Sequence, residues 1–312
     1  MTIPKNGCQV MNIIEVENLQ KKFHGKEVLR DLSLTVGRGD IYGFLGPNGS
    51  GKTTTLRIML GLLAKDGGRI MVMGQNVELQ DPEIRKKVNM LPESHGFYSW
   101  MRSTEYLVYF GELYGRKLDK SMRQYLLELV GLDSEDTRSI RQYSRGMKQR
   151  LGIARTLIND PELVFLDEPT NGLDPKGRRD IHDLLKRLNK ERSMTIVLST
   201  HILDDVEHLC NRIGILSKGK MQYQGSLNEA EGVHAPLYRF YFEREVERKN
   251  LAAIPGVHVL SQDKGWVHCR LDKNSPDKAV AALVSRGLPI SQVVRENQEL
   301  EEIYLHYTGG AS

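Results

Sequence analysis

Residues Gly46 to Thr53 read GPNGSGKT and match the phosphate-binding pattern G-x-x-x-x-G-K-[ST]. The pattern follows a short apolar run, Ile41–Leu45, that is typical of a buried strand, and it precedes a segment with helical character, residues 52–63. Its glycines let consecutive backbone N–H groups converge on an anion at a helix N-terminus, where the helix dipole adds positive charge. The chain is therefore predicted to bind a nucleoside triphosphate.

The motif also predicts roles for individual side chains. Lys52 is expected to reach the β- and γ-phosphates and to assist catalysis, and the Thr53 hydroxyl is expected to ligate Mg²⁺. The predicted nucleotide-binding residues of this loop are Gly46, Pro47, Asn48, Gly49, Ser50, Gly51, Lys52, Thr53 and Thr54.

Two acidic residues end a second apolar run. Leu163–Leu166 reads LVFL and is followed by Asp167 and Glu168. Open α/β sheets bind ligands at the carboxyl ends of their strands, so this pair is expected beside the phosphate loop. Asp167 is predicted to hold Mg²⁺, directly or through water, and Glu168 to act as the general base that polarises the attacking water.

The order of these segments predicts an α/β fold with a parallel sheet. Apolar runs at 41–45, 163–166 and 195–198 are separated by helical segments, and residues 95–160 are expected to be mostly helical. Three regions are expected: a flexible lead (1–10), an ATPase domain (11–225), and a small α+β C-terminal extension (226–312) in which apolar residues alternate.

The spacing of the cysteines bears on the redox compartment, and the net charge bears on nucleic-acid binding. Cys8, Cys210 and Cys269 are widely spread and form no metal-binding pair, which fits a reducing cytoplasm. The net charge of +4 is too small to indicate a nucleic-acid partner, and none is predicted.

No segment of the sequence is predicted to span a membrane. The longest suitable apolar stretch, Ile58–Ala64, is enclosed by Arg57 and Lys65 and is far shorter than the roughly 18 residues that a spanning helix needs.

A third motif lies between the first two. Tyr143–Arg150 reads YSRGMKQR and resembles the L-S-G-G-Q signature of the nucleotide-binding domain of ATP-binding-cassette (ABC) transporters. The resemblance covers residues 11–225. It implies a P-loop NTPase with a RecA-like parallel core, an antiparallel β subdomain and a helical subdomain. It also implies that Ser144 and Gly146 grip the γ-phosphate of an ATP held by a second subunit. Without the other motifs, the segment is also read as a plain helix N-cap.

The resemblance assigns two further positions. Asn171–Asp174, here called the D-loop, follows the acidic pair, and the resemblance places Asp174 at a dimer interface. Asp174 before Pro175 is equally a good helix start. His201 matches the switch histidine of the family, which contacts the γ-phosphate and orients the water together with Glu168.

The resemblance also assigns roles to Phe23 and Glu93, and each role has an alternative. Phe23 lies where the family carries an aromatic residue that stacks on adenine; the alternative is a core phenylalanine at a strand end. Glu93 occupies the position of a glutamine that contacts Mg²⁺. A carboxylate can ligate the ion, but its charge beside the triphosphate also allows a place outside the metal shell.

The resemblance implies a mechanism and its partners. Two copies are expected to form a head-to-tail homodimer with two ATPs at its interface, which closes on binding and opens on hydrolysis. A separate integral-membrane permease is implied, which alone contacts the transported substrate, and the chain is expected peripherally on the cytoplasmic face of the inner membrane. The C-terminal extension resembles that of bacterial ABC-2 type exporter ATPases and suggests dimerisation or regulation.

The loop His95–Met101 is rich in aromatic residues and is expected to dock the permease or, alternatively, to pack locally in the helical lobe. Two other functions compete: a soluble ABC ATPase acting on DNA or ribosomes, and a module that only senses ATP. The first is disfavoured because one cassette is present and no long coiled coil interrupts it. The second is disfavoured by the presence of Glu168 and His201.

Overall fold

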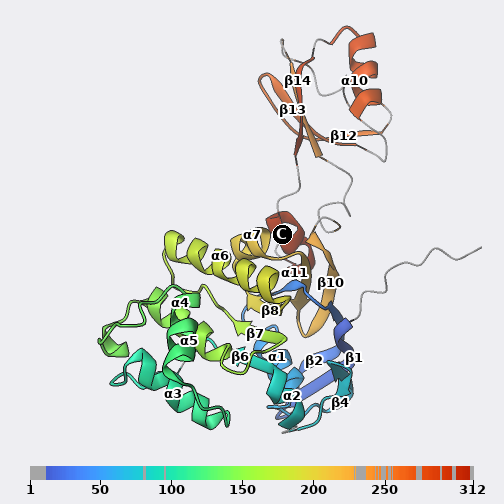
Figure 1. The fold of residues 1–312 in the computed structure, drawn as a ribbon. Helices are drawn as coiled ribbons and strands as arrows, with labels where there is room; N and C mark the ends of the chain where they lie inside the picture. Colours follow the sequence, from blue (N-terminus) through green and yellow to red (C-terminus); the bar gives the residue numbers. More distant parts are fainter. Residues whose placement is uncertain are drawn as a thin grey trace, which may run out of the picture. The chain divides into compact units, whose positions relative to one another are not determined.

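The computed structural model divides into two compact units, Met1–Gly225 and Ser226–Ser312 (Figure 1). It describes residues 12–79, 82–94, 96–227, 229, 237–242, 244, 246, 251, 254, 256–271, 276–288, 290–296 and 300–309. The predicted lead 1–10, which includes Cys8, lies outside the described residues, as does His95.

A six-stranded sheet forms the centre of the first unit, in the order β10-β9-β3-β8-β7-β6. Strands β6, β7, β8, β3 and β9 pair in parallel, and the turn Lys218-Gly219 leads from β9 to β10. The strands are β3 Ile41–Leu45, β6 Val88–Leu91, β7 Leu163–Asp167, β8 Thr195–Thr200, β9 Arg212–Ser217 and β10 Lys220–Ser226. The predicted parallel α/β core is confirmed.

The strand order brings the predicted motifs to one edge of this sheet. Leu45 pairs with Thr200 across β3 and β8, and Asp167 pairs with Ser199 across β7 and β8. Because parallel strands end on the same side, the phosphate loop after β3, the residues after β8 and the acidic end of β7 are neighbours.

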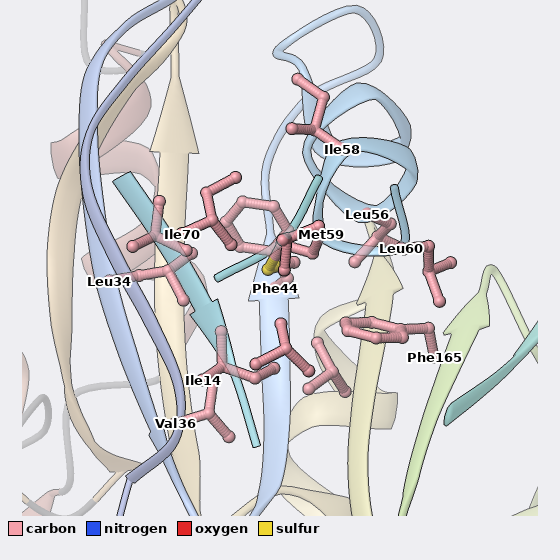
Figure 2. Close-up of a cluster of buried hydrophobic side chains, with 14 of the residues drawn as sticks. Ile14, Leu34, Val36, Phe44, Leu56, Ile58, Met59, Leu60, Ile70 and Phe165 are labelled. Carbon is pink, nitrogen blue, oxygen red and sulfur yellow. The ribbon is translucent and has the colours of Figure 1, made fainter. Parts of the chain in front are cut away.

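A second, antiparallel sheet in the first unit has the order β2-β1-β4-β5. Its strands are β1 Asn12–Phe23, β2 Lys26–Gly37, β4 Gly67–Val72 and β5 Gln75–Asn76. Figure 2 shows Phe44 of β3 among Ile70 and Leu34 of this sheet and Met59 of α1. Full burial of a side chain such as Phe44 contributes roughly 1.5–3 kcal/mol, so this core fixes α1 and the loop before it.

Helices flank the central sheet and form a lobe between β6 and β7. They are α1 Lys52–Met59, α2 Pro82–Lys87, α3 Ser103–Leu113, α4 Lys120–Leu129, the 3-10 helix η1 Ile140–Gln142, α5 Arg145–Thr156, α6 Pro175–Arg192 and α7 Leu203–Leu209. The first helix is shorter than the predicted 52–63. It ends at Met59 because Leu60 is its C-cap and Gly61 takes a φ of 63°, a left-handed conformation that does not continue a helix.

The second unit contains a four-stranded antiparallel sheet in the order β12-β13-β11-β14. Its elements are β11 Leu237–Phe242, β12 Val257–Asp263, β13 Trp266–Leu271, α10 Pro276–Ser285, β14 Ile290–Glu296 and α11 Leu300–Thr308. Alternate residues of β11 and β13, such as Phe240 and Cys269, are fully buried. Burial raises the pKa of the Cys269 thiol to about 12, so this cysteine is a core side chain and not a reactive one.

Candidate ATP site

The phosphate loop is held by contacts that only glycine permits. A Cβ atom on Gly46 would lie 2.3 Å from the backbone oxygen of Leu216, and one on Gly51 would lie 2.6 Å from Leu29 Cδ2. Gly51 also takes a φ of 112°, which side chains rarely adopt. The Ser50 hydroxyl is buried without a hydrogen-bond partner among the described residues. The loop is thus a tight backbone turn whose Ser50 hydroxyl is unpaired within the described part of the chain. Successive backbone N–H groups in such a turn are suited to binding an anion.

Lys52 folds back over this turn. Its Nζ donates to the carbonyl oxygens of Gly46, at 2.7 Å, and Pro47, at 3.3 Å, and it lies 4.0 Å from Glu168 Oε1. Burial lowers the pKa of Lys52, and the neighbouring carboxylates of Glu168 and Asp167 partly oppose this effect. A bound phosphate group would add negative charge beside this buried ammonium and would favour its charged form.

Thr53 and Asp167 meet across the space between α1 and β7. The Thr53 hydroxyl donates to Asp167 Oδ2 at 3.0 Å, and Ser199 also donates to the Asp167 carboxylate. A hydroxyl and a carboxylate are oxygen ligands of the kind that Mg²⁺ prefers. No group of three or more His, Cys, Asp or Glu residues that could share a metal was found in the part of the chain that the structure describes. The residues present fit a magnesium ion whose remaining ligands are phosphate and water.

Glu168 and His201 form a pair at the mouth of the site. His201 Nδ1 lies 2.9 Å from Glu168 Oε1, while the buried Oε2 atom has no hydrogen-bond partner among the described residues. Glu168 takes a φ of 51°, and its N–H donates to the Ser199 carbonyl at 2.9 Å. A left-handed conformation at a non-glycine residue is costly and clusters at functional sites. A buried carboxylate oxygen without a partner is costly, which marks Oε2 as a candidate functional atom.

Lys52, Thr53, Glu168 and His201 line one cavity of about 360 Å³. Its walls also include Phe23, whose side chain is 40% exposed and lies under the ammonium group of Lys21 at 5.2 Å. The lining residues are Phe23, Val28, Asn48, Gly49, Gly51, Lys52, Thr53, Thr54, Glu93, Glu168, Asn171 and His201. Phe23 is therefore an exposed ring on the cavity wall, as a base-stacking residue must be, and not a core residue.

Glu93 lines this cavity and also an adjoining one of about 390 Å³. One of its oxygens, Oε1, accepts a hydrogen bond from Asn171 Nδ2 at 3.2 Å, which connects the segment after β6 to the D-loop. The predicted contact between Glu93 and Mg²⁺ stays a prediction.

Ser144 begins α5 and accepts a hydrogen bond from the Met147 N–H at 3.2 Å. Its side chain is exposed, and a Cβ added to Gly146 would come no closer than 4.0 Å to another atom, the Ser144 hydroxyl. Arg145, which replaces a signature glycine, donates from Nη1 to the Gly172 carbonyl at 3.0 Å. The signature segment Tyr143–Arg150 is thus joined to the D-loop of its own chain.

Asp174 begins α6, and its side chain accepts a hydrogen bond from the Gly177 N–H at 2.7 Å. Its helix-capping role is therefore part of the structure, and its role at a dimer interface stays a prediction.

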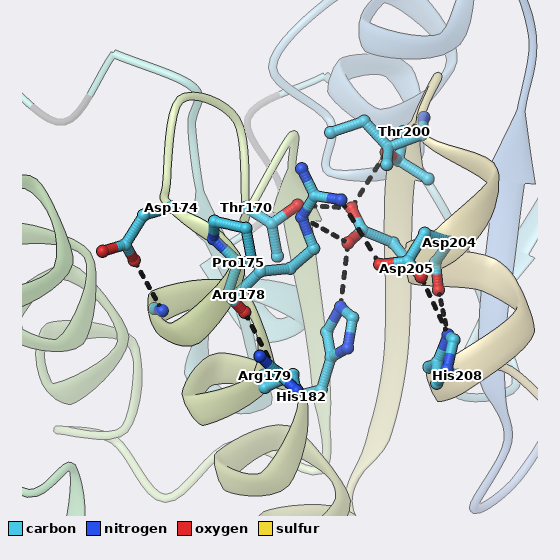
Figure 3. A network of polar contacts seen from close by, with 12 residues as sticks. Thr170, Asp174, Pro175, Arg178, Arg179, His182, Thr200, Asp204, Asp205 and His208 are labelled. Atoms are coloured by element: carbon cyan, nitrogen blue, oxygen red, sulfur yellow. Dashed lines mark hydrogen bonds and ion pairs between the residues drawn. The ribbon is translucent and has the colours of Figure 1, made fainter.

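One group of polar residues behind the site was not anticipated from the sequence. Asp205 of α7 contacts Thr170, Thr200, Arg178 and His182 (Figure 3). No motif connects these positions, and only the packing of α6 and α7 beside β8 brings them together.

In the aromatic loop before α3, some side chains pack against α3 and another is exposed. Tyr98 packs edge-on against Tyr109, with a ring-centroid distance of 5.2 Å, and Phe97 lies 5.2 Å from Tyr106. Trp100, in contrast, is 71% exposed.

Comparison with known proteins agrees with this geometry. Residues 29–171 match the family model described as ABC transporter. The chain is 34% identical over 307 residues to the bacitracin transport ATP-binding protein BcrA of Bacillus licheniformis, with 96% of this chain and 98% of BcrA covered.

Two solved structures share the fold and part of the sequence. CbiO1 from Clostridium perfringens, part of the ABC transporter complex cbiONQ, has a TM-score of 0.65 and 27% identity, covering 71% of this chain and 91% of cbiO1. The ATP-binding cassette MJ0796, in a dimeric post-hydrolysis state bound to ADP and Pi, has a TM-score of 0.62 and 25% identity, covering 69% of this chain and 98% of that one.

None of the helices in the described part of the chain combines the length and apolar character needed to cross a bilayer. The phosphate loop, the acidic strand end and these similarities lead to one conclusion: the chain belongs to the ABC transporter family and is an ATP-binding subunit that hydrolyses ATP.

Proposed function

We propose that two copies of this chain close on two ATP molecules and drive a separate membrane permease. One observation carries the proposal. The cavity that holds the phosphate loop, Glu168 and His201 is not lined by Ser144 or Gly146, which are accessible elsewhere on the same unit. If the helix N-terminus at Ser144 binds phosphate, as its amides and dipole allow, that phosphate belongs to the ATP of a second chain.

Each ATP site is formed by residues of both chains. Lys52 neutralises the β- and γ-phosphates, and the adenine ring stacks on Phe23. Thr53 and Asp167 would hold Mg²⁺, with Glu93 as a further ligand, and the bound ion would supply positive charge to the phosphate oxygens. The partner chain contributes its own Ser144, Gly146 and Asp174.

Hydrolysis uses the pair at the mouth of the cavity. Glu168 accepts the proton of the attacking water, and its Oε2 atom has no hydrogen-bond partner among the described residues. His201 binds Oε1 at 2.9 Å and keeps the carboxylate oriented while it contacts the γ-phosphate. Cleavage separates the phosphate held by one chain from that held by the other, so the dimer opens.

The partner is an integral-membrane permease, and the chain sits peripherally on the cytoplasmic face of the cell membrane. The similarity to cbiO1, part of a transporter complex, and to BcrA supports this assignment. The exposed Trp100 is the part of the aromatic loop that is available to a partner.

The proposed direction of transport is export. The C-terminal unit and the altered signature both resemble those of exporter ATPases, and the similarity to two bacitracin transport ATP-binding proteins makes bacitracin the first cargo to test. We assign dimer stabilisation or regulation to residues 226–312.

Transport into membrane vesicles tests this function. The chain is expressed with a candidate integral-membrane permease, and ATP-dependent bacitracin uptake is measured in inside-out and right-side-out vesicles. Export predicts uptake into inside-out vesicles that is lost with Glu168→Gln. Binding of the purified chain to vesicles with and without the permease tests the partner independently of the cargo. ATP hydrolysis with no permease-dependent binding would contradict the transporter assignment.

A further inference from the structure

Asp205 is a fully buried carboxylate that contacts both segments carrying the predicted catalytic residues. Its Oδ2 atom accepts hydrogen bonds from the Thr170 hydroxyl and, at 3.3 Å, from the Thr200 hydroxyl. Thr170 lies two residues after Glu168, and Thr200 directly precedes His201. One oxygen atom therefore joins the end of β8 to the segment that follows β7 (Figure 3).

The second oxygen of Asp205 faces α6. His182 Nε2 lies 2.8 Å from Oδ1, and Arg178 Nε lies 3.8 Å from the same atom. Burying a carboxylate is costly unless donors and positive charge replace its hydration. These contacts supply that replacement and hold the carboxylate in one place.

The backbone around His201 depends on this network. The Thr200 hydroxyl also accepts a hydrogen bond from the Ile202 N–H at 3.0 Å, so the network contacts the residues on both sides of His201. The His201 side chain itself is 40% exposed. Because packing encloses this side chain only partly, its position opposite Glu168 depends on where its backbone is held.

We propose that Asp205 is a positioning residue for ATP hydrolysis: through Thr170 and Thr200 it keeps Glu168 and His201 at contact distance. Because Thr170 directly precedes the D-loop, movement of that loop on dimer closure is passed to His201 through the same carboxylate. The inference rests on the proposed roles of Glu168 and His201, and it assigns a function to residues that touch neither nucleotide nor metal.

Matched substitutions at Thr170 test the inference. Thr170→Val removes the hydroxyl at nearly constant volume, Thr170→Ser keeps it, and Asp205→Asn removes the charge. Thr156→Val is the control: Thr156 is as buried as Thr170, and among the described residues its hydroxyl bonds only to the Ile153 carbonyl in its own helix. Steady-state kcat and the Kd for ATP, measured with a fluorescent analogue, are compared in full-length protein.

We expect kcat to fall about tenfold with Thr170→Val and about 100-fold with Asp205→Asn, because a small misplacement of catalytic groups has effects of this size. The Kd for ATP should change less than twofold, and Thr170→Ser and Thr156→Val should keep the parent kcat. In a His201→Ala background, Thr170→Val should cause a smaller further loss than in the parent, because the part of its effect that passes through His201 is already absent.

Three results would overturn the inference: a parent kcat for Thr170→Val, equal losses for Thr170→Val and Thr156→Val, or losses that multiply with that of His201→Ala. If Asp205→Asn does not fold, the Thr170 pair decides alone. Failure of the proposed function looks different, since in that case the parent protein itself shows no hydrolysis dependent on Glu168.

Discussion

His201 Nδ1 lies 2.9 Å from Glu168 Oε1, although the two residues are 33 positions apart in the sequence. They follow neighbouring parallel strands, β8 and β7, which accounts for their proximity. The contact uses one carboxylate oxygen and leaves the other, Oε2, without a partner among the described residues. The pair therefore has the geometry of a base held in place by an orienting group.

Removing the imidazole should impair hydrolysis more than binding. His201→Ala is expected to lower kcat by roughly 100-fold, because the carboxylate loses its orienting contact and the γ-phosphate loses a donor. The Kd for ATP should change only a few-fold. His258→Ala is the control, since His258 is exposed and lies in the second unit. An unchanged kcat for His201→Ala would remove His201 from the mechanism.

The Thr53 hydroxyl should determine the magnesium requirement. Thr53→Val keeps the shape and deletes the oxygen that lies 3.0 Å from Asp167 Oδ2, so half-maximal ATPase activity should need about tenfold more Mg²⁺. Thr53→Ser should behave like the parent. A magnesium titration of ATPase activity measures both. Identical curves for the valine and serine variants would show that Thr53 does not ligate the ion.

Phe23 should contribute base stacking. Phe23→Ala is expected to weaken ATP binding by about 1–3 kcal/mol, which is roughly 5- to 150-fold in Kd, and Phe23→Trp should keep binding. Inorganic triphosphate has no base, so calorimetry should give the same Kd for it with the parent and with Phe23→Ala. Equal weakening of both ligands would indicate that Phe23 acts on the phosphate loop and not on adenine.

A substitution at Gly146 should distinguish an effect on folding stability from an effect on contacts between the two chains. A Cβ at this position meets nothing closer than 4.0 Å within the chain, and alanine is favoured over glycine in helices by up to about 1 kcal/mol. Gly146→Ala should therefore keep or raise the melting temperature, yet lower ATPase activity at least tenfold if the partner's phosphate approaches here. Gly46→Ala is the contrast, because its Cβ would lie 2.3 Å from the Leu216 oxygen, and about 1–3 kcal/mol of stability should be lost.

For Gly146→Ala the decisive comparison is between thermal unfolding and turnover of the same preparation. Full ATPase activity in a stable Gly146→Ala protein would remove Gly146 from the proposed interface.

The sequence predicts the core of this site because local pattern and sheet topology agree there. Gly46–Thr53 matches a motif in which each specified residue type meets a physical requirement. Apolar runs at 41–45, 163–166 and 195–198 place this motif beside Asp167 and Glu168. The end of α1 is predicted less well. Leu60 and the apolar residues after it continue the helical pattern, and only the left-handed conformation of Gly61 ends the helix.

The Asp205 network could not be predicted from the sequence. Its members come from the end of β8, two helices and the segment after β7, and their spacing follows no motif. The contact of Arg145 with the Gly172 carbonyl has the same origin, since a helix N-terminus and a loop meet only after the chain has folded. Such contacts depend on tertiary packing, which single-sequence periodicity does not contain.

The mass of the Glu168→Gln protein with and without Mg-ATP tests the central claim most directly. Glutamine keeps the shape of the side chain but cannot accept the proton, so ATP should stay bound and uncleaved. Size-exclusion chromatography with light scattering should give the mass of one 35.5 kDa chain without nucleotide and twice that mass with Mg-ATP. Adding Gly146→Ala should reduce the dimer fraction. A Glu168→Gln protein that binds ATP and remains a monomer at every concentration would contradict the account.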